Sequence, residues 1–313
     1  MPDVQKQTKG FHKIPIQKVG VRNIEIPFSI PTINGEIFNT YALVSSYCDL
    51  VEDIKGINMS RISRTINKVL NNNKNGFTNL NDFVYELKKA HKTNHIFIRA
   101  KFNYIIKVKS PITELDSYEP TIVIFESILE DNKLKNYLTV RTTEMSLCPC
   151  SKEMSLLVNN ITDEELLSLN TLQDGLRTKI LNSGFGAHNQ KSNIEVKIEL
   201  NKENDKIYWI EDLINTIKKS SSCPTFTTLK RPDEKYITEV SYMGGYYKDN
   251  KFIKVEGSGP KFVEDIARDI SEKLNKELNE RILDYLIVVN NEESIHSSNI
   301  TATAILNAGI NLK

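Results

Sequence analysis

Residues 96–109 alternate strictly between apolar side chains and mostly polar ones. The apolar set is Ile96, Ile98, Ala100, Phe102, Tyr104, Ile106 and Val108. The positions between them are Phe97, Arg99, Lys101, Asn103, Ile105, Lys107 and Lys109. Successive side chains of a strand point to opposite faces of a sheet, so this pattern predicts a long strand with one mostly polar face. The fold is therefore expected to be built around a sheet.

The rest of the chain is expected to surround that strand with a repeated order of elements. Apolar and β-branched runs predict strands at 21–30, 40–50, 121–127, 137–147, 194–200, 283–289 and 300–306. Asn34-Gly35 is a hairpin signal between the first two of these strands. Apolar residues at helical spacing predict helices within 59–70, 80–87, 210–217 and 266–278. Each half thus reads as strands, two helices and strands again, which predicts an α+β fold with antiparallel sheets.

Composition limits the classes of partner that the chain can have. A chain of 313 residues with 39% hydrophobic and 26% charged residues is typical of a soluble globular protein. A net charge of +1 gives no global field that favours nucleic acid or an anionic membrane, so neither is expected as a partner. The start of the chain lacks the apolar core of a signal peptide, and four cysteines do not make a disulfide framework. These features predict a cytoplasmic protein.

Cys148 and Cys150 flank a single proline inside a polar stretch. The other two cysteines, Cys48 and Cys223, are isolated. Thiolate sulfur is a soft metal ligand and a strong nucleophile, so two crowded thiols in a cysteine-poor chain indicate chemistry. The alternative is that both are buried and serve as small apolar side chains. The motif alone does not decide between the two.

Further polar clusters follow this motif in a fixed order. They are Ala-His-Asn-Gln at 187–190, Lys-Arg-Pro-Asp-Glu-Lys at 230–235, Lys-Phe-Val-Glu-Asp at 261–265 and Asn-Glu-Glu-Ser-Ile-His at 291–296. Together with 3–5, 20–21 and 55–61, these segments resemble the GTP cyclohydrolase IB family over nearly the whole chain. The resemblance implies metal-dependent hydrolysis of GTP to 7,8-dihydroneopterin 3'-triphosphate and formate, a step towards folate, other pterins or deazaguanines.

The resemblance also implies an architecture. The family has the tunnelling fold, with two tandem modules, each an antiparallel sheet with two helices, that assemble into barrels by oligomerisation. The expected division is an N-terminal segment at 1–15, a first module at 16–150, a helical insert at 151–186 and a second module at 187–313. We expect a homo-oligomer, in particular a tetramer, with active sites between subunits, because closing a barrel removes exposed sheet edges.

A metal site is implied by residues that are remote in sequence. The family motifs place the ligands at Cys148, His188 and Glu234, which leaves an open position for water on one divalent ion. Zinc, manganese and iron all suit these donors. Without the resemblance, His188 reads as a surface residue in a turn, and Glu234 as a solvated carboxylate at a charge-rich helix start. Cys150 is expected to orient the first ligand instead of binding the ion.

Catalytic and substrate-binding roles are implied in the same way. The catalytic set is Cys148, Glu264 and His296: Glu264 is expected to accept hydrogen bonds from the guanine base, and His296 to move a proton. The family usually has a second histidine where this chain has Ser298. Otherwise Glu264 is simply a carboxylate favoured by a helix dipole.

The triphosphate is expected to bind Lys55, Ser60 and Arg61. These residues match a family segment near the substrate, and charge plus a helix N-terminus would bind phosphate there. The alternative is an ordinary helix start that Asn58 or Ser60 caps.

Three other functions remain open. One is an archaeal-type cyclohydrolase that makes 7,8-dihydroneopterin 2',3'-cyclic phosphate with ferrous iron. Another is a thiol-dependent nitrile reductase of the same fold with Cys148 as nucleophile, and the third is a purine- or pterin-binding protein without catalysis. The insert favours the archaeal type, because relatives of that type carry an insert at a similar place, whereas Asn58 and the segment Ser-Lys-Glu at 151–153 favour the bacterial type. Thr162 and Glu165 form a capping box that predicts a helix inside it, whereas the Gly- and Tyr-rich segment 241–259 predicts a surface loop or small hairpin.

Overall fold

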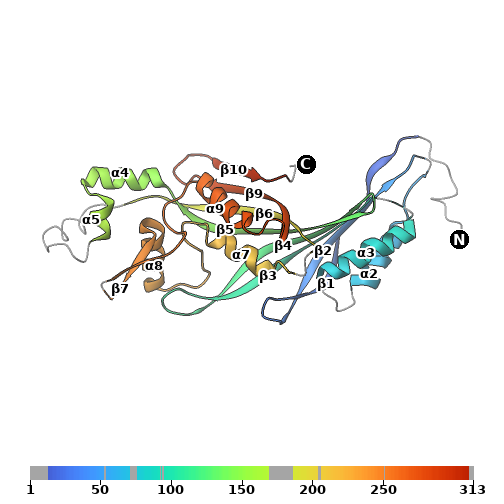
Figure 1. Ribbon diagram of the computed structural model, residues 1–313, viewed down its shortest axis with the longest axis horizontal. Helices are drawn as coiled ribbons and strands as arrows, with labels where there is room; N and C mark the ends of the chain where they lie inside the picture. Colours follow the sequence, from blue (N-terminus) through green and yellow to red (C-terminus); the bar gives the residue numbers. More distant parts are fainter. Residues whose placement is uncertain are drawn as a thin grey trace.

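The computed structural model describes residues 13–309, apart from 53, 71–75, 92, 94, 169–185, 204–205 and 250. Its main feature is one antiparallel 8-stranded sheet in the order β1-β2-β3-β4-β5-β6-β9-β10 (Figure 1). The strands are β1 (Ile16–Pro31), β2 (Ile37–Leu50), β3 (Ile96–Lys109), β4 (Asp116–Glu130), β5 (Lys133–Leu147), β6 (Asn189–Leu200), β9 (Ile282–Glu292) and β10 (Thr301–Asn307). The described helices are α2 (Met59–Leu70), α3 (Gly76–His91), α4 (Pro149–Asn159), α5 (Asp163–Leu167), α7 (Ile210–Lys218), α8 (Arg231–Met243) and α9 (Val263–Asn275).

The alternating segment 96–109 is strand β3, as the sequence predicts. Its apolar residues from Ile96 to Tyr104 are buried, whereas Arg99 and Lys101 lie on the opposite face. The strand pairs with β2 on one edge and with β4 on the other, so Arg99 lies between Ser45 and Glu126. The hairpin from β1 to β2 turns at Gly35, whose φ of 81° lies in the left-handed region that glycine adopts readily.

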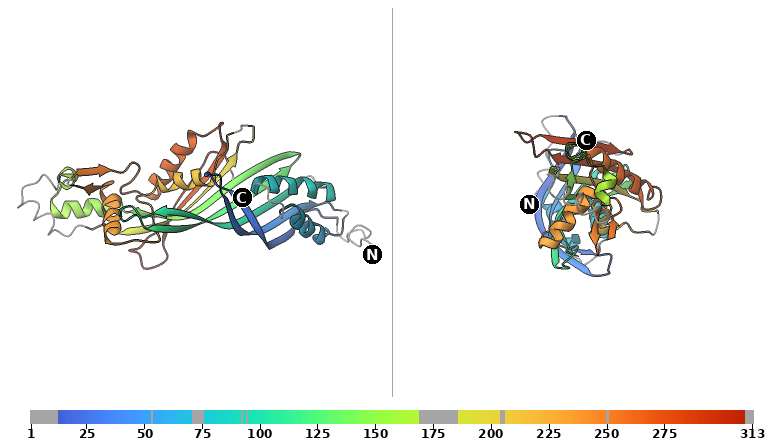
Figure 2. Two further views of the ribbon diagram at one scale, coloured as in Figure 1. Left: turned by 90° about the horizontal axis from the view of Figure 1, so that it is seen from below. Right: turned by 90° about the vertical axis from the view of Figure 1, so that its left-hand side faces the viewer.

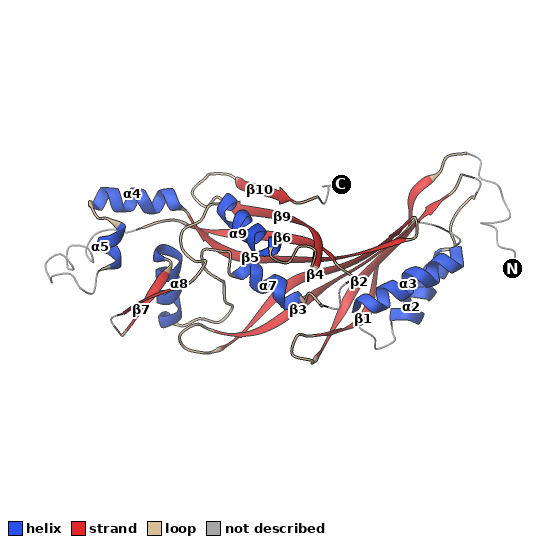
Figure 3. Ribbon diagram, viewed as in Figure 1, coloured by secondary structure: helices blue, strands red, loops and turns tan. Residues whose placement is uncertain are grey.

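Four helices cover one face of the sheet and bury its apolar side chains. Helices α2 and α3 pack on the first strands, and α7 and α9 pack on β5, β9 and β10 (Figure 3, blue). The core is one continuous cluster that includes Ile62, Phe83 and Ile98 from the first half and Val196, Ile214 and Ile270 from the second. The opposite face carries none of these four helices.

An order of two strands, two helices and two strands occurs twice. The first copy is β1, β2, α2, α3, β3 and β4; the second is β5, β6, α7, α9, β9 and β10. The predicted α+β class with antiparallel sheets is confirmed, and this repeated order is the one expected of two tandem tunnelling-fold modules. The two copies share one sheet, so the division at residues 150 and 187, like assembly into barrels, stays a prediction.

The second half carries additional elements at one end of the molecule. Along the chain, helices α4 and α5 follow β5. Helix α8 comes after α7 and is followed, before α9, by the hairpin of β7 (Gly245–Lys248) and β8 (Lys251–Lys254). These elements lie at the end opposite α2 and α3 (Figures 1 and 2). The small hairpin predicted within 241–259 is thus confirmed, although α8 extends to Met243. In the described part of the chain, no helix is long and apolar enough to cross a membrane.

The insert after Cys148 leaves and returns at neighbouring points. The Gly186 backbone N–H donates to Ser155 Oγ of α4 at 2.9 Å. The predicted capping box is present, because Thr162 N donates to Glu165 Oε2 and Glu165 N donates to Thr162 Oγ1. The structure does not describe the side chains of Leu166, Leu167 and Leu169, whose apolar contacts are expected of the helix after Thr162.

Candidate active site

Cys148 lies where strand β5 ends and helix α4 begins. Leu147, the last residue of β5, pairs with Asn189 at the start of β6. Cys148 is the N-cap of α4, with Pro149 in the first turn, and its Sγ accepts a hydrogen bond from the Ser151 backbone at 3.5 Å. Proline suits this place because its fixed φ matches a helix and it has no N–H to satisfy. The thiol is half-buried, whereas Cys150 is exposed, so the two cysteines have different surroundings.

His188 lies directly beside Cys148. The Cys148 backbone N–H donates to the His188 carbonyl oxygen at 3.3 Å. His188 Nδ1 is 3.4 Å from Ser294 Oγ, in the loop that follows β9. The same loop contains His296 and is joined to β6 by a hydrogen bond from Gln190 to Glu293. The structure therefore brings the Cys148 and His188 segments together with the loop that carries His296.

A hollow of about 1000 Å³ opens beside this loop. It is lined by side chains from β6, β9, β10 and the loop itself, among them Gln190, Glu293 and His296. His296 is exposed, and its backbone N–H donates to the Glu293 carbonyl oxygen at 3.2 Å. An exposed imidazole at the rim of a polar hollow can exchange protons with a ligand and with solvent.

The segment that leads into Glu264 contacts the end of β5 through a backbone hydrogen bond. The Lys261 N–H donates to the Leu147 carbonyl oxygen at 3.1 Å. Lys261 lies three residues before Glu264, and Leu147 lies directly before Cys148. Lys261 is itself buried, and its ammonium donates to the Ser220 carbonyl oxygen at 2.8 Å and to Asp269 at 2.5 Å. Glu264 is exposed in the first turn of α9. The charged sequence cluster that contains Lys261 does not reveal that this lysine is buried.

Glu234 lies in the first turn of α8 and is exposed, whereas its neighbour Asp233 is fully buried. Asp233 accepts hydrogen bonds from the backbone of Ile112, Thr113 and Lys230 and from the Thr113 hydroxyl. Burial alone would raise the pKa of this carboxyl, but these hydrogen bonds outweigh it and hold the pKa well below its usual range. Asp233 thereby fixes the start of α8 on the loop between β3 and β4.

The described residues supply an incomplete set of metal ligands. Thiolate and imidazole are donors that suit zinc or iron, and Cys148 and His188 are neighbours. Among the residues that the structure describes, however, no three side chains of His, Cys, Asp or Glu lie close enough together to hold a metal ion. Glu234 is therefore not placed beside the other two here, and the three-ligand centre stays a prediction.

The residues expected to bind triphosphate lie far from Cys148 within one chain. Ser60 and Arg61 begin α2, and the Ser60 hydroxyl donates to Asn58 Oδ1 at 2.6 Å. Lys55 lies in the segment before α2 and is exposed. Helix α2 lies at the opposite end of the molecule from α4 and α8 (Figures 1 and 2). One chain alone therefore does not bring Lys55, Ser60 and Arg61 to the thiol.

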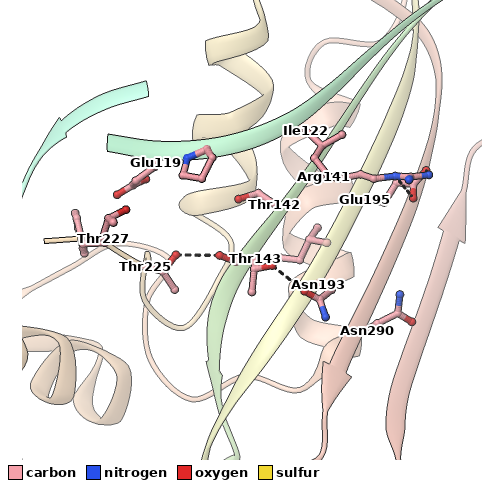
Figure 4. Close-up of a pocket in the computed structure, with 13 residues that line it drawn as sticks. Glu119, Ile122, Arg141, Thr142, Thr143, Asn193, Glu195, Thr225, Thr227 and Asn290 are labelled. Carbon is pink, nitrogen blue, oxygen red and sulfur yellow. Dashed lines mark hydrogen bonds and ion pairs between the residues drawn. The ribbon is translucent and has the colours of Figure 1, made fainter. Parts of the chain in front are cut away.

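A second cavity, of about 640 Å³, lies between the sheet and the loop after α7 (Figure 4). Thr142, Thr143 and Asn193 line it from β5 and β6, and Thr225 lines it from the loop. Beneath the loop, Glu144 is buried, and its carboxylate accepts a hydrogen bond from the Thr225 N–H at 3.0 Å. Burial raises the pKa of Glu144 to about 7. This carboxyl therefore anchors the loop and titrates near neutral pH.

Glu119 also lines this cavity. Its side chain is buried beside Lys218, with which it forms an ion pair, yet its Oε1 atom accepts no hydrogen bond. Burial lowers the pKa of Lys218 to about 8. Neither residue stood out in the sequence, because Glu119 belongs to none of the recognised polar clusters and Lys218 is one of two adjacent lysines at the end of a helix.

Comparison with known proteins identifies the family. The family model described as type I GTP cyclohydrolase folE2 matches residues 1–302. The chain belongs to this family. FolE2 relatives match at full length, and one, the GTP cyclohydrolase FolE2 of Dictyoglomus thermophilum, is 32% identical over 302 residues, which cover 96% of each chain. The FolE2 proteins of Thermosipho melanesiensis and Thermotoga maritima are 30% and 32% identical, again over 96% of each chain.

Among solved structures, the chain is similar to urate oxidases. A Bacillus sp. TB-90 urate oxidase has a TM-score of 0.47 at 8% sequence identity, covering 94% of this chain and 99% of that one. The uricase of Arthrobacter globiformis has a TM-score of 0.44 at 7% identity, covering 93% and 92%.

Proposed function

We propose that this FolE2 family member is a metal-dependent GTP cyclohydrolase that converts GTP to 7,8-dihydroneopterin 3'-triphosphate and formate. The observation that carries the proposal is the junction of β5 and β6. There the Cys148 N–H meets the His188 carbonyl oxygen at 3.3 Å, and the loop with His296 contacts His188 through Ser294. Residues that are far apart in sequence and belong to three family motifs thus meet at one end of the sheet.

Cys148, His188 and Glu234 would hold one divalent ion, zinc, manganese or iron. When bound, the ion would lower the pKa of a bound water, so that hydroxide would be available near neutral pH to attack C8 of guanine. Cys148 suits its role because it caps the N-terminus of α4, where the Ser151 backbone N–H donates to its sulfur, and a helix N-terminus favours negative charge. Glu234 sits on a helix start that Asp233 anchors, and its side chain is exposed.

Glu264 and His296 would act on the purine. Glu264 would accept hydrogen bonds from guanine N1–H and the 2-amino group, which rejects bases that lack these donors. His296 would carry protons between the opened ring and solvent, because it is exposed at the rim of the hollow. Neither role requires a change in the fold.

Two subunits would complete each site. Lys55, Ser60 and Arg61 are the residues proposed for triphosphate binding, yet α2 and α4 lie at opposite ends of one chain (Figure 1). A second copy that brings its α2 end to the α4 end would supply them. We therefore propose a homo-oligomer, in particular a tetramer, in which the triphosphate of GTP is bound by one subunit and the metal by its neighbour.

The test is turnover of GTP by protein loaded separately with zinc, manganese or iron. Mass spectrometry of the product and an assay of released formate identify the reaction. A linear triphosphate product with stoichiometric formate is expected, whereas a 2',3'-cyclic phosphate would reassign the protein to the archaeal-type reaction. The variant Cys150→Ala is the matched control and should retain turnover. Absence of formate with every metal would refute the proposal.

A further inference from the structure

The face of the sheet without helices contains a hollow lined by cations. Its volume is about 580 Å³, and it spans β1, β2, β3 and the middle of β5. Five of the lining side chains are cationic, and none is a carboxylate: they are Lys18, Arg22, Arg99, Lys101 and Arg141. The whole chain has a net charge of only +1, so this is a local concentration of positive charge.

Only part of this charge is neutralised by acidic side chains. Arg141 Nε lies 2.7 Å from Glu195, and Arg99 Nε lies 3.8 Å from Glu126, which also pairs with Lys197. Because 3.8 Å is too long for a hydrogen bond, the buried Arg99 Nε donates none. Glu126 is therefore only weakly paired with Arg99.

The remaining cations have no acidic partner among the residues that the structure describes. Lys18 lies over the Phe97 ring, with Nζ 5.7 Å from the ring centre. In the described part of the chain, neither Arg22 nor Lys101 forms an ion pair. Like charges that are gathered without counter-charges repel one another, and an anion with several charges relieves that repulsion. Arginine and lysine together are the usual donors for phosphate oxygens.

The backbone holds these donors in place. Lys101 and Arg99 point from β3, which is paired on both edges, with β2 and β4. Arg141 on β5 precedes Cys148 by seven residues (148 − 141), which is roughly 23 Å of extended strand. The hollow is therefore separate from the proposed metal site and also from the start of α2, which lies on the helix-covered side of the sheet.

We infer that this hollow is a binding site for a triphosphate chain, either free or as part of a nucleoside triphosphate. The five cations supply the charge, and the Ser45 and Tyr47 hydroxyls, which also line the hollow, supply neutral hydrogen bonds. The inference rests on the charge and geometry of this face and does not require the proposed reaction. A site of this kind would concentrate anionic ligands on the open face of the sheet.

The experiment measures binding of inorganic triphosphate by isothermal titration calorimetry. The double variant Arg22→Gln/Lys101→Gln removes the two cations that lack partners. The control variant Lys107→Gln/Lys109→Gln removes two cations from the same face of β3, both paired with Asp116 at 2.8 and 2.5 Å. We expect the first variant to weaken binding at least about tenfold and the control to leave it unchanged, because a charge-assisted contact to phosphate is lost only in the first.

Two further arms separate the alternatives. GTP should compete with triphosphate, and guanosine should not, if the chain of phosphates is what binds. Binding that is equal in both double variants but lost in Lys55→Gln would place the triphosphate at the start of α2 and overturn the inference. So would a wild-type protein that binds no triphosphate at low salt. Far-UV circular dichroism confirms that each variant is folded, and single Lys101→Gln replaces the double variant if that one does not fold.

Discussion

Replacing Asp233 by asparagine should destabilise the start of α8, the helix whose first turn also carries Glu234. Asp233 Oδ1 accepts from the backbone of Ile112 and Thr113, both at 2.9 Å, and an amide oxygen can keep these contacts. Oδ2 accepts from the Thr113 hydroxyl at 2.5 Å and from the Lys230 N–H at 2.9 Å. An amide NH2 in that place cannot accept, so the Lys230 N–H loses the acceptor that Asp233 provides. That loss, together with the lost charge, should cost about 2–4 kcal/mol.

Urea denaturation of both proteins measures this difference in the free energy of unfolding. Since the pKa of Asp233 is held low, its stabilisation is present above the ordinary carboxyl value of 3.8 and is lost as the pH falls through the folded-state pKa. The difference should therefore be constant near neutral pH and shrink only in strong acid. Glu234→Gln is the control: its exposed side chain should cost less than about 0.5 kcal/mol. Equal stabilities of Asp233→Asn and wild type would refute the anchoring role of Asp233.

Three further predictions concern stability, substrate and assembly. Burial raises the pKa of Glu144 from the ordinary value of 4.5 to about 7, so the protonated carboxyl stabilises the fold fully below pH 4.5 and this stabilisation is lost as the pH rises through 7. Thermal melts at pH 5 and pH 8 should show the wild type losing up to about 3 kcal/mol of unfolding free energy relative to Glu144→Gln. Glu264→Gln should weaken GTP binding by roughly 1.5–3 kcal/mol while metal content and fold are retained, and unchanged affinity in calorimetry would make Glu264 an ordinary helix-start carboxylate. Mixing inactive Cys148→Ala with inactive Arg61→Ala by subunit exchange should restore about a quarter of the wild-type turnover if each site draws on two subunits, whereas no recovery after verified exchange would contradict shared sites.

Periodicity predicted the sheet well, because alternation reports directly which face a strand buries. Strand β3 has the bounds that its alternation indicates. The helix α4 was missed, although Pro149 directly after a candidate cap is a recognisable start signal. A cysteine is an uncommon N-cap, so the sequence pattern at Cys148 does not predict a helix start.

Long-range polar contacts could not be predicted from the sequence. The sequence singles out Glu234 in its charged cluster and gives no sign that the neighbouring Asp233 is buried against Ile112, which is 121 residues away. Nor does the sequence indicate that the Lys261 ammonium is enclosed by backbone carbonyl groups and Asp269. In both cases the polar partner is brought into contact by the tertiary fold, and no pattern in the local sequence predicts which partner it is. The approach of Cys148 to His188 has the same character, and only the family resemblance anticipated it.

The metal content of two cysteine variants tests the central claim most directly. Purified wild type, Cys148→Ala and Cys150→Ala are loaded with zinc, desalted and analysed by elemental mass spectrometry, with circular dichroism as the check on folding. We predict about one zinc per wild-type subunit, the same for Cys150→Ala, and a loss of most of the metal in folded Cys148→Ala, because a four-coordinate site that loses its thiolate loses a strong donor. Full metal occupancy in Cys148→Ala would contradict a metal centre at the junction of β5 and β6.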